Sequence, residues 1–278
     1  HKRLGDGDTG PNTGGMGTVA PSTNMSLDVH KQIMQEIILP TIKGLDAEGR
    51  RYQGVLYAGL MMTDAGPRVL EYNARFADPE TQVIMARMKS DLVPVLKGVA
   101  DGQLGDVKME WTKEPAICVV LAAGGYPGEV ETGKEVKGLP ALKGVPDLLV
   151  FHAATALRDG KVITVGGRVL GITATGQNLD AAVQRAYDAA AKINFEGMPS
   201  REDVGQRAVA RLPPSREDAF GQPDRRHPDG QRQRPAGHGG VCEGPGAVRN
   251  RLRRARALGP SQPRRSRAAG LRQDHPGA

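Results

Sequence analysis

The sequence predicts an α+β fold arranged as two folded units and a disordered tail, and three observations lead to this prediction. Short apolar runs separated by Asp-Gly, Gly-Gly and Asp-Ala-Gly-Pro predict strands joined by turns. Apolar residues at helical spacing predict amphipathic helices between some of these strands. After residue 212 the chain is rich in Arg, Pro and Gly and poor in large apolar side chains. It therefore cannot bury enough surface there to offset its chain entropy.

The first unit is expected to cover residues 1–105 and to begin with a loop. The opening stretch HKRLGDGDTGPNTGGMGTVAPST has five glycines in its first fifteen residues and no periodicity. Such a long loop is usually either functional or disordered. Ser26 is a candidate cap for a helix whose apolar residues recur every four positions. We expect this helix to end around Pro40 and Gly44.

A hairpin and a helical region complete the first unit. The turn residues 64–67, DAGP, separate two predicted strands, 52–63 and 68–73. Residues 79–99 then predict helices, with Pro79 at a favourable position in the first turn.

The second unit, residues 106–212, is expected to be small and also α+β. Residues 116–128 predict a buried strand that runs into a glycine-rich turn. Residues 151–176 predict three short strands separated by Asp-Gly and Gly-Gly. Residues 179–193 predict a helix with one apolar face, made of Ala182, Val183, Ala186, Tyr187 and Ala190.

The composition favours a cytoplasmic protein that does not bind membranes. No run approaches the roughly 18 consecutive apolar residues that span a membrane, and no secretory signal is present. Cys118 and Cys242 form neither a disulfide framework nor a zinc-site spacing, which suits a reducing compartment. We interpret Cys118 as a small core residue, and His30 and His152 as structural.

The stretch VLEYNARFADPETQ, residues 69–82, offers groups for chemistry. Side chains alternate along a strand, so Glu71 and Asn73 point the same way and Arg75 follows near the strand end. Carboxylate and amide oxygens suit Mg²⁺ bound to nucleotide phosphates, and an arginine could stabilise a transferring phosphoryl group. The residues alone equally allow a polar strand end in which Arg75 pairs with Asp78 or Glu80 in solvent.

Two glycine-containing segments are weaker candidates. The loop from Lys2 to Gly17 offers two cations and backbone N–H groups that could approach an anion, or it is an ordinary surface loop. Gly166 and Gly167 precede Arg168 between two predicted strands. This segment is either a tight hairpin with an exposed arginine or a place where Arg168 faces a ligand.

Several long motifs, taken in order, resemble the phosphoribosylamine-glycine ligases, also called glycinamide ribonucleotide synthetases. The motifs are HKRLGDGDTGPNTGGMG, YQGVLYAGLM, LEYNARFADPETQ, AAGGYPG and GGRVL, and the resemblance covers roughly residues 1–212. It implies the C-terminal part of an ATP-grasp domain in residues 1–105 and the family's C-terminal domain in residues 106–212. It also implies an ATP-dependent carbon-nitrogen ligase of purine biosynthesis that joins glycine to 5-phosphoribosylamine through a glycyl phosphate.

The resemblance assigns roles to individual residues. It implies Glu71 and Asn73 as ligands of Mg²⁺ or Mn²⁺, and Arg75 as the catalytic arginine beside the transferred phosphoryl group. The residues it implies for substrate binding are Lys2, Arg3, Asn12, Thr13, Gly14, Gly15 and Arg168. Related enzymes carry another acidic ligand about twelve residues upstream of the Glu, where this chain has Gly59. Ala77 stands where the family usually has Gly, which would strain the turn only if φ is positive there.

The resemblance also implies that the adenine pocket and a phosphate-binding lysine lie upstream of His1. We therefore expect this chain to be the C-terminal half of the ligase, inactive alone and monomeric in its full-length form. Another ATP-grasp carboxylate-amine ligase remains an alternative, because a fold and a metal site do not fix the acceptor.

The tail, residues 213–278, has 14 Arg, no Lys and a formal net charge of +8, whereas the rest of the chain has −1. A nucleic-acid-binding tail is one interpretation. We favour out-of-frame translation, and so expect no nucleic-acid partner. Residues 229–238, shifted by one base, can encode Met-Gly-Ser-Asp-Ser-Asp-Leu-Pro-Val, which resembles the start of carboxyaminoimidazole ribonucleotide mutase.

Overall fold

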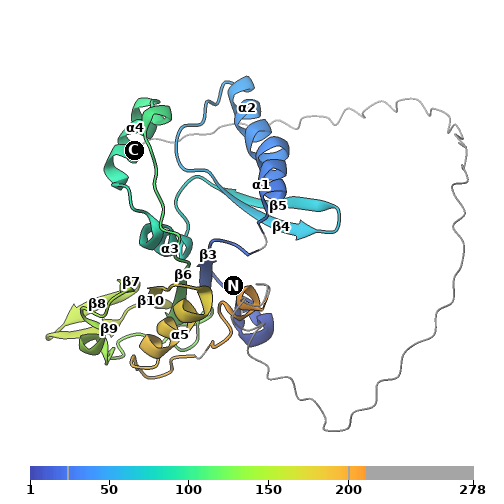
Figure 1. The fold of residues 1–278 in the computed structure, drawn as a ribbon. Helices are drawn as coiled ribbons and strands as arrows, with labels where there is room; N and C mark the ends of the chain where they lie inside the picture. The colour runs from blue at the N-terminus through green and yellow to red at the C-terminus, as the bar shows by residue number, and fades with distance from the viewer. Residues whose placement is uncertain (24, 200, 211–278) are drawn as a thin grey trace, which may run out of the picture. The chain divides into compact units, whose positions relative to one another are not determined.

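The computed structural model describes residues 1–23, 25–199 and 201–210, so every expectation for the tail lies outside the described residues. Its centre is a four-stranded antiparallel sheet with the order β3-β6-β10-β7 (Figure 1). The strands are β3 (Gly17–Ala20), β6 (Ala116–Ala122), β10 (Arg168–Thr175) and β7 (Leu148–His152). Among the described residues, no helix is both long and apolar enough to cross a membrane.

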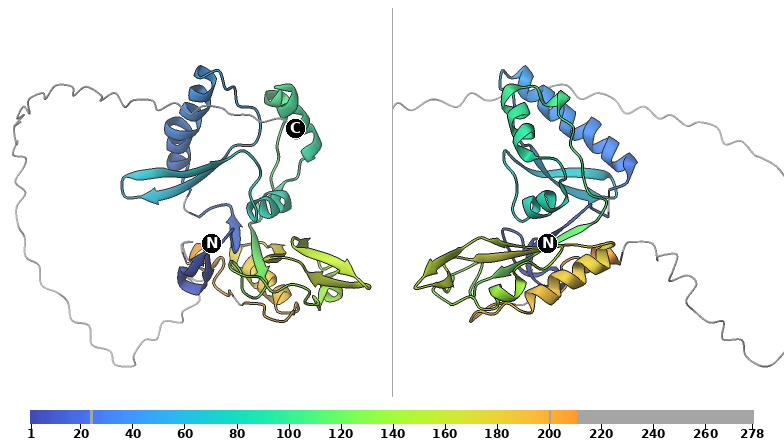
Figure 2. Two further views of the ribbon diagram at one scale, coloured as in Figure 1. Left: turned by 180° about the vertical axis from the view of Figure 1, so that it is seen from behind. Right: turned by 60° about the vertical axis from the view of Figure 1, so that its left-hand side comes forward.

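Two helices cover opposite faces of this sheet (Figure 2). Every residue of β6 is buried, as expected of a strand with both faces covered. Alternate residues of β6 pack with α5 (Leu179–Ala190) in the main core, whereas Ala116 and Cys118 pack with Val83 of α3 (Glu80–Arg87). Burial raises the pKa of the Cys118 thiol to about 12, which agrees with its predicted role as a core residue.

The opening segment is more regular than the sequence predicts. It forms a ribbon of β1 (Arg3–Gly5) and β2 (Thr9–Asn12) around a short 3-10 turn, η1 (Asp6–Asp8), and then continues into β3. The prediction of a structureless loop was wrong because the pairing partner of β3 is β6, about 100 residues away. The central sheet therefore takes one strand from before residue 106 and three from after it.

The predicted hairpin is confirmed as β4 (Tyr57–Thr63) and β5 (Gly66–Asn73). Thr63 pairs with Gly66, so the turn contains only the two residues between them. Gly66 has a φ of 93°, which explains why a glycine stands where the chain re-enters the sheet.

The predicted helix begins as expected but continues past Pro40. Ser26 caps α1 (Leu27–Ile33), since its Oγ accepts a hydrogen bond from the N–H of Val29 at 3.2 Å. A π-helical segment, η2 (Met34–Ile38), leads into α2 (Leu39–Ala47). Pro40 lies directly after this π-helical segment, and the backbone at Ile38 and Leu39 is right-handed helical, so the helix runs through the proline. The expectation that the helix ends around Pro40 and Gly44 was wrong, since α2 ends at Ala47.

The helical region 79–99 divides into α3 and α4 (Leu92–Asp101), followed by a 3-10 turn, η3 (Leu104–Asp106). Asp91 caps α4, because its carboxylate accepts a hydrogen bond from the N–H of Val93 at 2.9 Å. Asp is a preferred residue at the N-cap position, so the sequence contains the signal for this cap.

The described part of the region predicted as the second unit contains the predicted helix α5 and one strand more than expected. A 3-10 turn, η4 (Leu139–Leu142), precedes β7, and a short helix, α6 (Gln206–Val209), follows α5. The strands β8 (Thr155–Arg158) and β9 (Lys161–Thr164) form a separate hairpin through Asp159 and Gly160, both with positive φ. The strands β9 and β10 do not pair with each other, so the predicted hairpin turn at Gly166–Gly167 was wrong.

Candidate active site

The hairpin β4–β5 presents Glu71 and Asn73 on one face, as the alternation of a strand requires. Glu71 pairs with Gly59 of β4, and Asn73 pairs with Tyr57. A Cβ atom at Gly59 would lie 3.0 Å from Cγ of Glu71. The glycine therefore leaves room for the glutamate side chain.

Lys2 reaches Glu71 from the opening segment. Its Nζ lies 3.8 Å from Oε1 of Glu71, and both side chains remain more than half exposed, at 63% and 53%. Within the described part of the chain, the side-chain amide of Asn73 has no hydrogen-bond partner. A carboxylate and an ammonium group thus form an exposed ion pair, and Asn73 lies two residues further along the same face of β5.

Arg75 lies just beyond this group and is exposed. Its Nη1 donates a hydrogen bond to the backbone oxygen of the next residue, Phe76, at 3.1 Å. In the alternative interpretation Arg75 pairs with Asp78 or Glu80, but the structure places both acids elsewhere. Asp78 pairs with Arg168, and Glu80 accepts a hydrogen bond from the hydroxyl of Tyr57 at 3.4 Å.

Tyr57 lies within the electrostatic influence of Glu71 and Glu80. Its pKa is raised, first by burial and then by the negative charges of Glu80 and Glu71, while Arg75 opposes the shift. The tyrosine therefore remains a neutral hydrogen-bond donor beside the carboxylates. Neither Tyr57 nor Glu80 was singled out as a site residue from the sequence, although Glu80 belongs to the same motif.

Arg168 connects three separate segments. Its Nη1 donates to the backbone oxygens of Asp78 and Gly14 at 2.8 and 3.2 Å, and its Nη2 lies 3.2 Å from Oδ2 of Asp78. Only 23% of its side chain is exposed, so the expectation of an exposed hairpin arginine was wrong. Arg168 holds the Gly14 turn against the Asp78-Pro79 segment.

The glycines of the opening loop do not offer free donors at this turn. The N–H of Gly14 donates to the hydroxyl of Tyr126 at 2.9 Å, and the N–H of Gly15 donates to Oγ1 of Thr13 at 3.0 Å. The expectation that these N–H groups are free to approach an anion was therefore wrong. Thr13 is itself buried, and its hydroxyl donates to the backbone oxygen of Lys2 at 2.8 Å.

Arg3 and Asn12 lie on the ribbon rather than beside Glu71. They are cross-strand partners at the open end of the ribbon β1–β2. Nη1 of Arg3 donates to the backbone oxygen of Gly10 at 2.7 Å. Of the two cations at the start of the chain, the structure thus brings only Lys2 to the metal-ligand candidates.

Ala77 has a φ outside the positive range, so it does not strain the turn before α3. Its side chain is buried, and its backbone oxygen accepts a hydrogen bond from the N–H of Thr81 at 2.9 Å. The departure from the usual glycine is therefore sterically harmless in this fold.

At this site, the side chains of Glu71 and Asn73 offer oxygen atoms to a cation. In the described ranges, no three His, Cys, Asp or Glu residues gather as a metal-ligand set. Mg²⁺ is commonly held by one or two protein carboxylates together with substrate phosphates. Glu71 and Asn73 fit that kind of site, with nucleotide phosphates as the remaining ligands.

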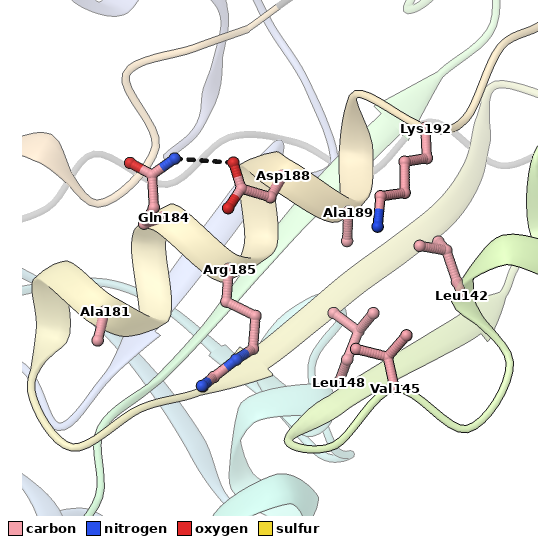
Figure 3. A pocket seen from close by; sticks show the side chains of 9 residues that line it. All are labelled: Leu142, Val145, Leu148, Ala181, Gln184, Arg185, Asp188, Ala189 and Lys192. Atoms are coloured by element: carbon pink, nitrogen blue, oxygen red, sulfur yellow. Dashed lines mark hydrogen bonds between the residues drawn. The ribbon is translucent and has the colours of Figure 1, made fainter.

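A separate pocket of about 430 Å³ lies between α5 and the loop after η4 (Figure 3). Its lining contains none of the site residues predicted from the sequence. Leu142, Val145 and Leu148 line the side that faces α5. The other lining residues are Ala181, Gln184, Arg185, Asp188 and Ala189 of α5, and Lys192, which follows it. We do not assign this pocket to the candidate active site.

Comparison with known proteins places this geometry in a family. Residues 1–81 match the family model for the ATP-grasp (A) domain of phosphoribosylglycinamide synthetase, and residues 116–207 match the model for its C domain. A phosphoribosylamine–glycine ligase of Vibrio vulnificus is 50% identical over 212 residues, covering 76% of this chain and 49% of the relative. The Salmonella typhimurium ligase is 52% identical over 213 residues, with the same coverage.

A solved structure agrees with these sequence matches. The crystal structure of phosphoribosylamine–glycine ligase from Thermotoga maritima has a TM-score of 0.62 and 41% identity, covering 73% of this chain and 49% of that one. The chain thus spans about half the length of the relatives it matches. Its motifs, its paired A and C domain matches and its fold all agree, and the chain belongs to the phosphoribosylglycinamide synthetase family.

Proposed function

We propose that this chain supplies one half of the active site of an ATP-dependent carbon-nitrogen ligase. The substrates proposed are glycine and 5-phosphoribosylamine, and the cofactors are ATP and Mg²⁺ or Mn²⁺. The observation that carries the proposal is the exposed ion pair of Lys2 with Glu71, with Asn73 on the same face of β5 and Arg75 two residues further along the chain. Relatives at about 50% identity, named for this activity, support it.

The proposed reaction has two steps. A carboxylate oxygen of glycine attacks the γ-phosphorus of ATP, which forms glycyl phosphate and releases ADP. The amine of 5-phosphoribosylamine then attacks the carbonyl carbon, forms the amide bond of glycinamide ribonucleotide and expels phosphate. A bound divalent cation would neutralise charge on the phosphate oxygens.

Each candidate residue near β5 has a proposed role in these steps. Glu71 and Asn73 hold the cation, and the Arg75 guanidinium stabilises charge on the phosphoryl group during transfer. Arg75 suits this role because it forms no ion pair within the described residues. Lys2, held beside Glu71, adds a second positive charge at the same place.

The Gly14 turn and Arg168 are proposed to border the second substrate. Arg168 already binds Asp78 and Gly14, so its first role is to fix the turn. Arg3, Asn12, Thr13 and Gly15 are proposed to contact the phosphoribosyl group through the ribbon and the turn. Of these, Thr13 contributes through the backbone it organises, because its side chain is buried.

Two further properties of the whole enzyme belong to this proposal. This chain spans about half the length of these relatives, and we propose that ligation also needs the half that it does not cover. We also propose that the complete enzyme is a cytoplasmic monomer.

A chimeric enzyme tests the proposal. Residues 1–212 would be joined to the uncovered half of the Vibrio vulnificus relative, and ADP formation dependent on glycine and 5-phosphoribosylamine would be measured. We expect activity in the chimera and a loss of about 100-fold or more in kcat for Glu71→Gln, because a metal ligand is removed.

The matched control is Glu48→Gln, since Glu48 is an exposed glutamate whose only ion pair among the described residues is with Arg50 at 3.9 Å. This variant should keep the activity of the chimera. Full activity of the Glu71→Gln chimera would exclude Glu71 as a metal ligand. A chimera that folds but forms no ADP when glycine and 5-phosphoribosylamine are both supplied would contradict the proposed reaction.

A further inference from the structure

Arg201 is a cation almost completely removed from solvent, with a side chain only 1% exposed. Its Nη2 lies 2.8 Å from Oδ1 of Asp8, and its Nε lies 2.7 Å from Oδ1 of Asp203. Its Nη1 donates to the backbone oxygen of Arg3, and its Nη2 also lies 3.2 Å from Nδ1 of His1. One guanidinium thus binds three residues of the opening segment, about 200 positions earlier in the sequence.

The backbone around Arg201 interlocks with the same segment. Oδ1 of Asp6 accepts hydrogen bonds from the N–H groups of Glu202 and Asp203 at 2.8 and 3.2 Å. In return, the N–H of Gly7 donates to Oδ2 of Asp203 at 2.9 Å. The 3-10 turn η1 therefore fits onto residues 201–205, and the two segments lie side by side in Figures 1 and 2.

The electrostatics favour this arrangement. A hydrogen bond from Arg201 lowers the pKa of Asp8, and Arg207 adds to the effect from 2.5 Å. Burial raises the pKa of Asp203, but hydrogen bonds from Arg201 and the N–H of Gly7 outweigh it, so the net pKa is lowered. Both carboxylates are thus charged at neutral pH, and a buried cation that lost them would lack compensation.

The contact leads directly to the candidate site. The backbone oxygen that Arg201 binds belongs to Arg3, and the preceding residue is Lys2, whose ammonium group reaches Glu71. The backbone oxygen of Lys2 in turn accepts two hydrogen bonds from Thr13, one from its N–H and one from its hydroxyl, both at 2.8 Å. Arg201 and the Gly14 turn are therefore connected through one continuous hydrogen-bonded ribbon.

We infer that Arg201 is a positioning residue, which holds the opening ribbon in the conformation that places Lys2 beside Glu71. It touches neither Lys2 nor Glu71 itself, and it acts through the backbone of Arg3 and the carboxylate of Asp8. The importance of this role for ligation rests on the proposed function. The clamp itself rests on the contacts alone.

Hydrogen exchange on the 278-residue chain tests the clamp. In Arg201→Met, the N–H groups of Gly7, Thr13 and Met16 should lose about tenfold or more of their protection, because the ribbon loses its anchor. Amides of β6 and β10 should keep theirs. Arg201→Lys should not rescue the ribbon, since an ammonium group cannot reach acceptors in four directions as the guanidinium does.

Two variants sharpen the experiment. Arg207→Met is the matched control, because Arg207 binds the same Asp8 but is half exposed and should leave the ribbon protected. Asp8→Asn weakens the clamp from the ribbon side without leaving a buried cation wholly unpaired, so it remains informative if Arg201→Met fails to fold. Unchanged ribbon protection in both Arg201→Lys and Asp8→Asn would overturn the inference. Equal losses in the ribbon, β6 and β10 would also overturn it, because they indicate only general destabilisation.

A binding measurement separates the clamp from the proposed function. Ribose 5-phosphate would be titrated into the same chains while the amide resonances of Lys2 and Gly14 are followed. We expect the Kd to rise about tenfold in Arg201→Lys and to stay unchanged in Arg207→Met. A protected ribbon in the unmodified chain without any response to ribose 5-phosphate would argue against the proposed substrate site and leave the clamp supported.

Discussion

At the scale of the residue, the Glu71 carboxylate forms one ion pair among the described residues, with Lys2, and more than half of its side chain is exposed. Exposed ion pairs contribute about 0–1 kcal/mol to stability. Replacing a residue in this setting therefore changes the free energy of unfolding only slightly. Its position is therefore better explained by the chemistry it can perform than by the stability it adds.

The first prediction follows from that exposure. Glu71→Gln should change the free energy of unfolding by no more than about 0.5 kcal/mol, because it removes only an exposed ion pair. Urea denaturation of the chain measures this. A loss well above 1 kcal/mol would show that Glu71 has a structural role that the geometry does not reveal.

The second prediction concerns Ala77. Because its φ is not positive, Ala77→Gly should destabilise the chain by about 0.5–1 kcal/mol, through the greater backbone entropy of glycine in the unfolded state. Thermal or urea unfolding of the two forms gives the difference. A more stable glycine variant would mean that alanine is strained at this position.

The scale of the element shows how the candidate site is held together. Tyr126 follows β6, packs against Gly167 before β10, and accepts the hydrogen bond of the Gly14 N–H. A Cβ atom at Gly167 would lie 2.3 Å from Cδ2 of the Tyr126 ring, which no real contact allows. The glycine at 167 is therefore required by the close approach of an aromatic ring.

Gly167→Ala should accordingly displace Tyr126 and destabilise the chain by about 1–3 kcal/mol, as overpacking usually does. Denaturation measures the loss, and the amide resonance of Gly14 should shift. Gly44→Ala, in α2, is the matched control because its Cβ would meet nothing within 4 Å. It should stabilise the helix by up to about 1 kcal/mol. If Gly167→Ala is as stable as the unmodified chain, the ring is not held where the structure places it.

The stability of the ribbon β1–β2 is expected to depend on pH through Asp8. The pKa of Asp8 is lowered from its usual value of 3.8, chiefly by a hydrogen bond from Arg201. A carboxylate with a lowered pKa in the folded state stabilises the fold above its unfolded pKa. That contribution is lost as the pH falls through the lower folded value.

We therefore expect the protection of the Gly7 and Thr13 amides to be constant from about pH 7 to 5 and to fall below about pH 4. Hydrogen exchange corrected for intrinsic rates measures this protection. In Asp8→Asn the decrease should be smaller and should start from lower protection. Protection that falls instead between pH 7 and 5 would point to a different titrating group.

Elements built from local contacts could be predicted from the sequence, and those that depend on distant partners could not. The Ser26 cap, the β4–β5 hairpin and the apolar face of α5 follow from neighbouring residues, and the structure contains all three. The ribbon β1–β2 and the strand β3 were missed because Arg201 and β6, which hold them, lie far away in the chain.

The candidate site shows the same division. Glu71 and Asn73 share a face because a strand alternates, and this much the spacing predicts. Their approach to Lys2, the use of Gly14 by Tyr126, and the pairing of Arg168 with Asp78 depend on the folded chain. No local pattern contains that information.

At the scale of the whole molecule, the central sheet joins the two segments that the family models match. The strand β3 comes from the segment matched by the ATP-grasp domain model, and its partner β6 comes from the segment matched by the C domain model. The ribbon that carries Lys2 is anchored in turn by residues 201–205. The described part of the chain therefore positions its share of the site as one connected structure.

The central claim is that this chain holds one half of a metal-phosphate site and needs the other half for ligation. The most direct measurement is ADP formation dependent on glycine and 5-phosphoribosylamine, made on the 278-residue chain before and after the uncovered half of the relative is added. We predict no activity from the chain alone, activity after the addition, and activity reduced about 100-fold or more when the chain carries Glu71→Gln. Activity of the chain alone that depends on both substrates would contradict the claim.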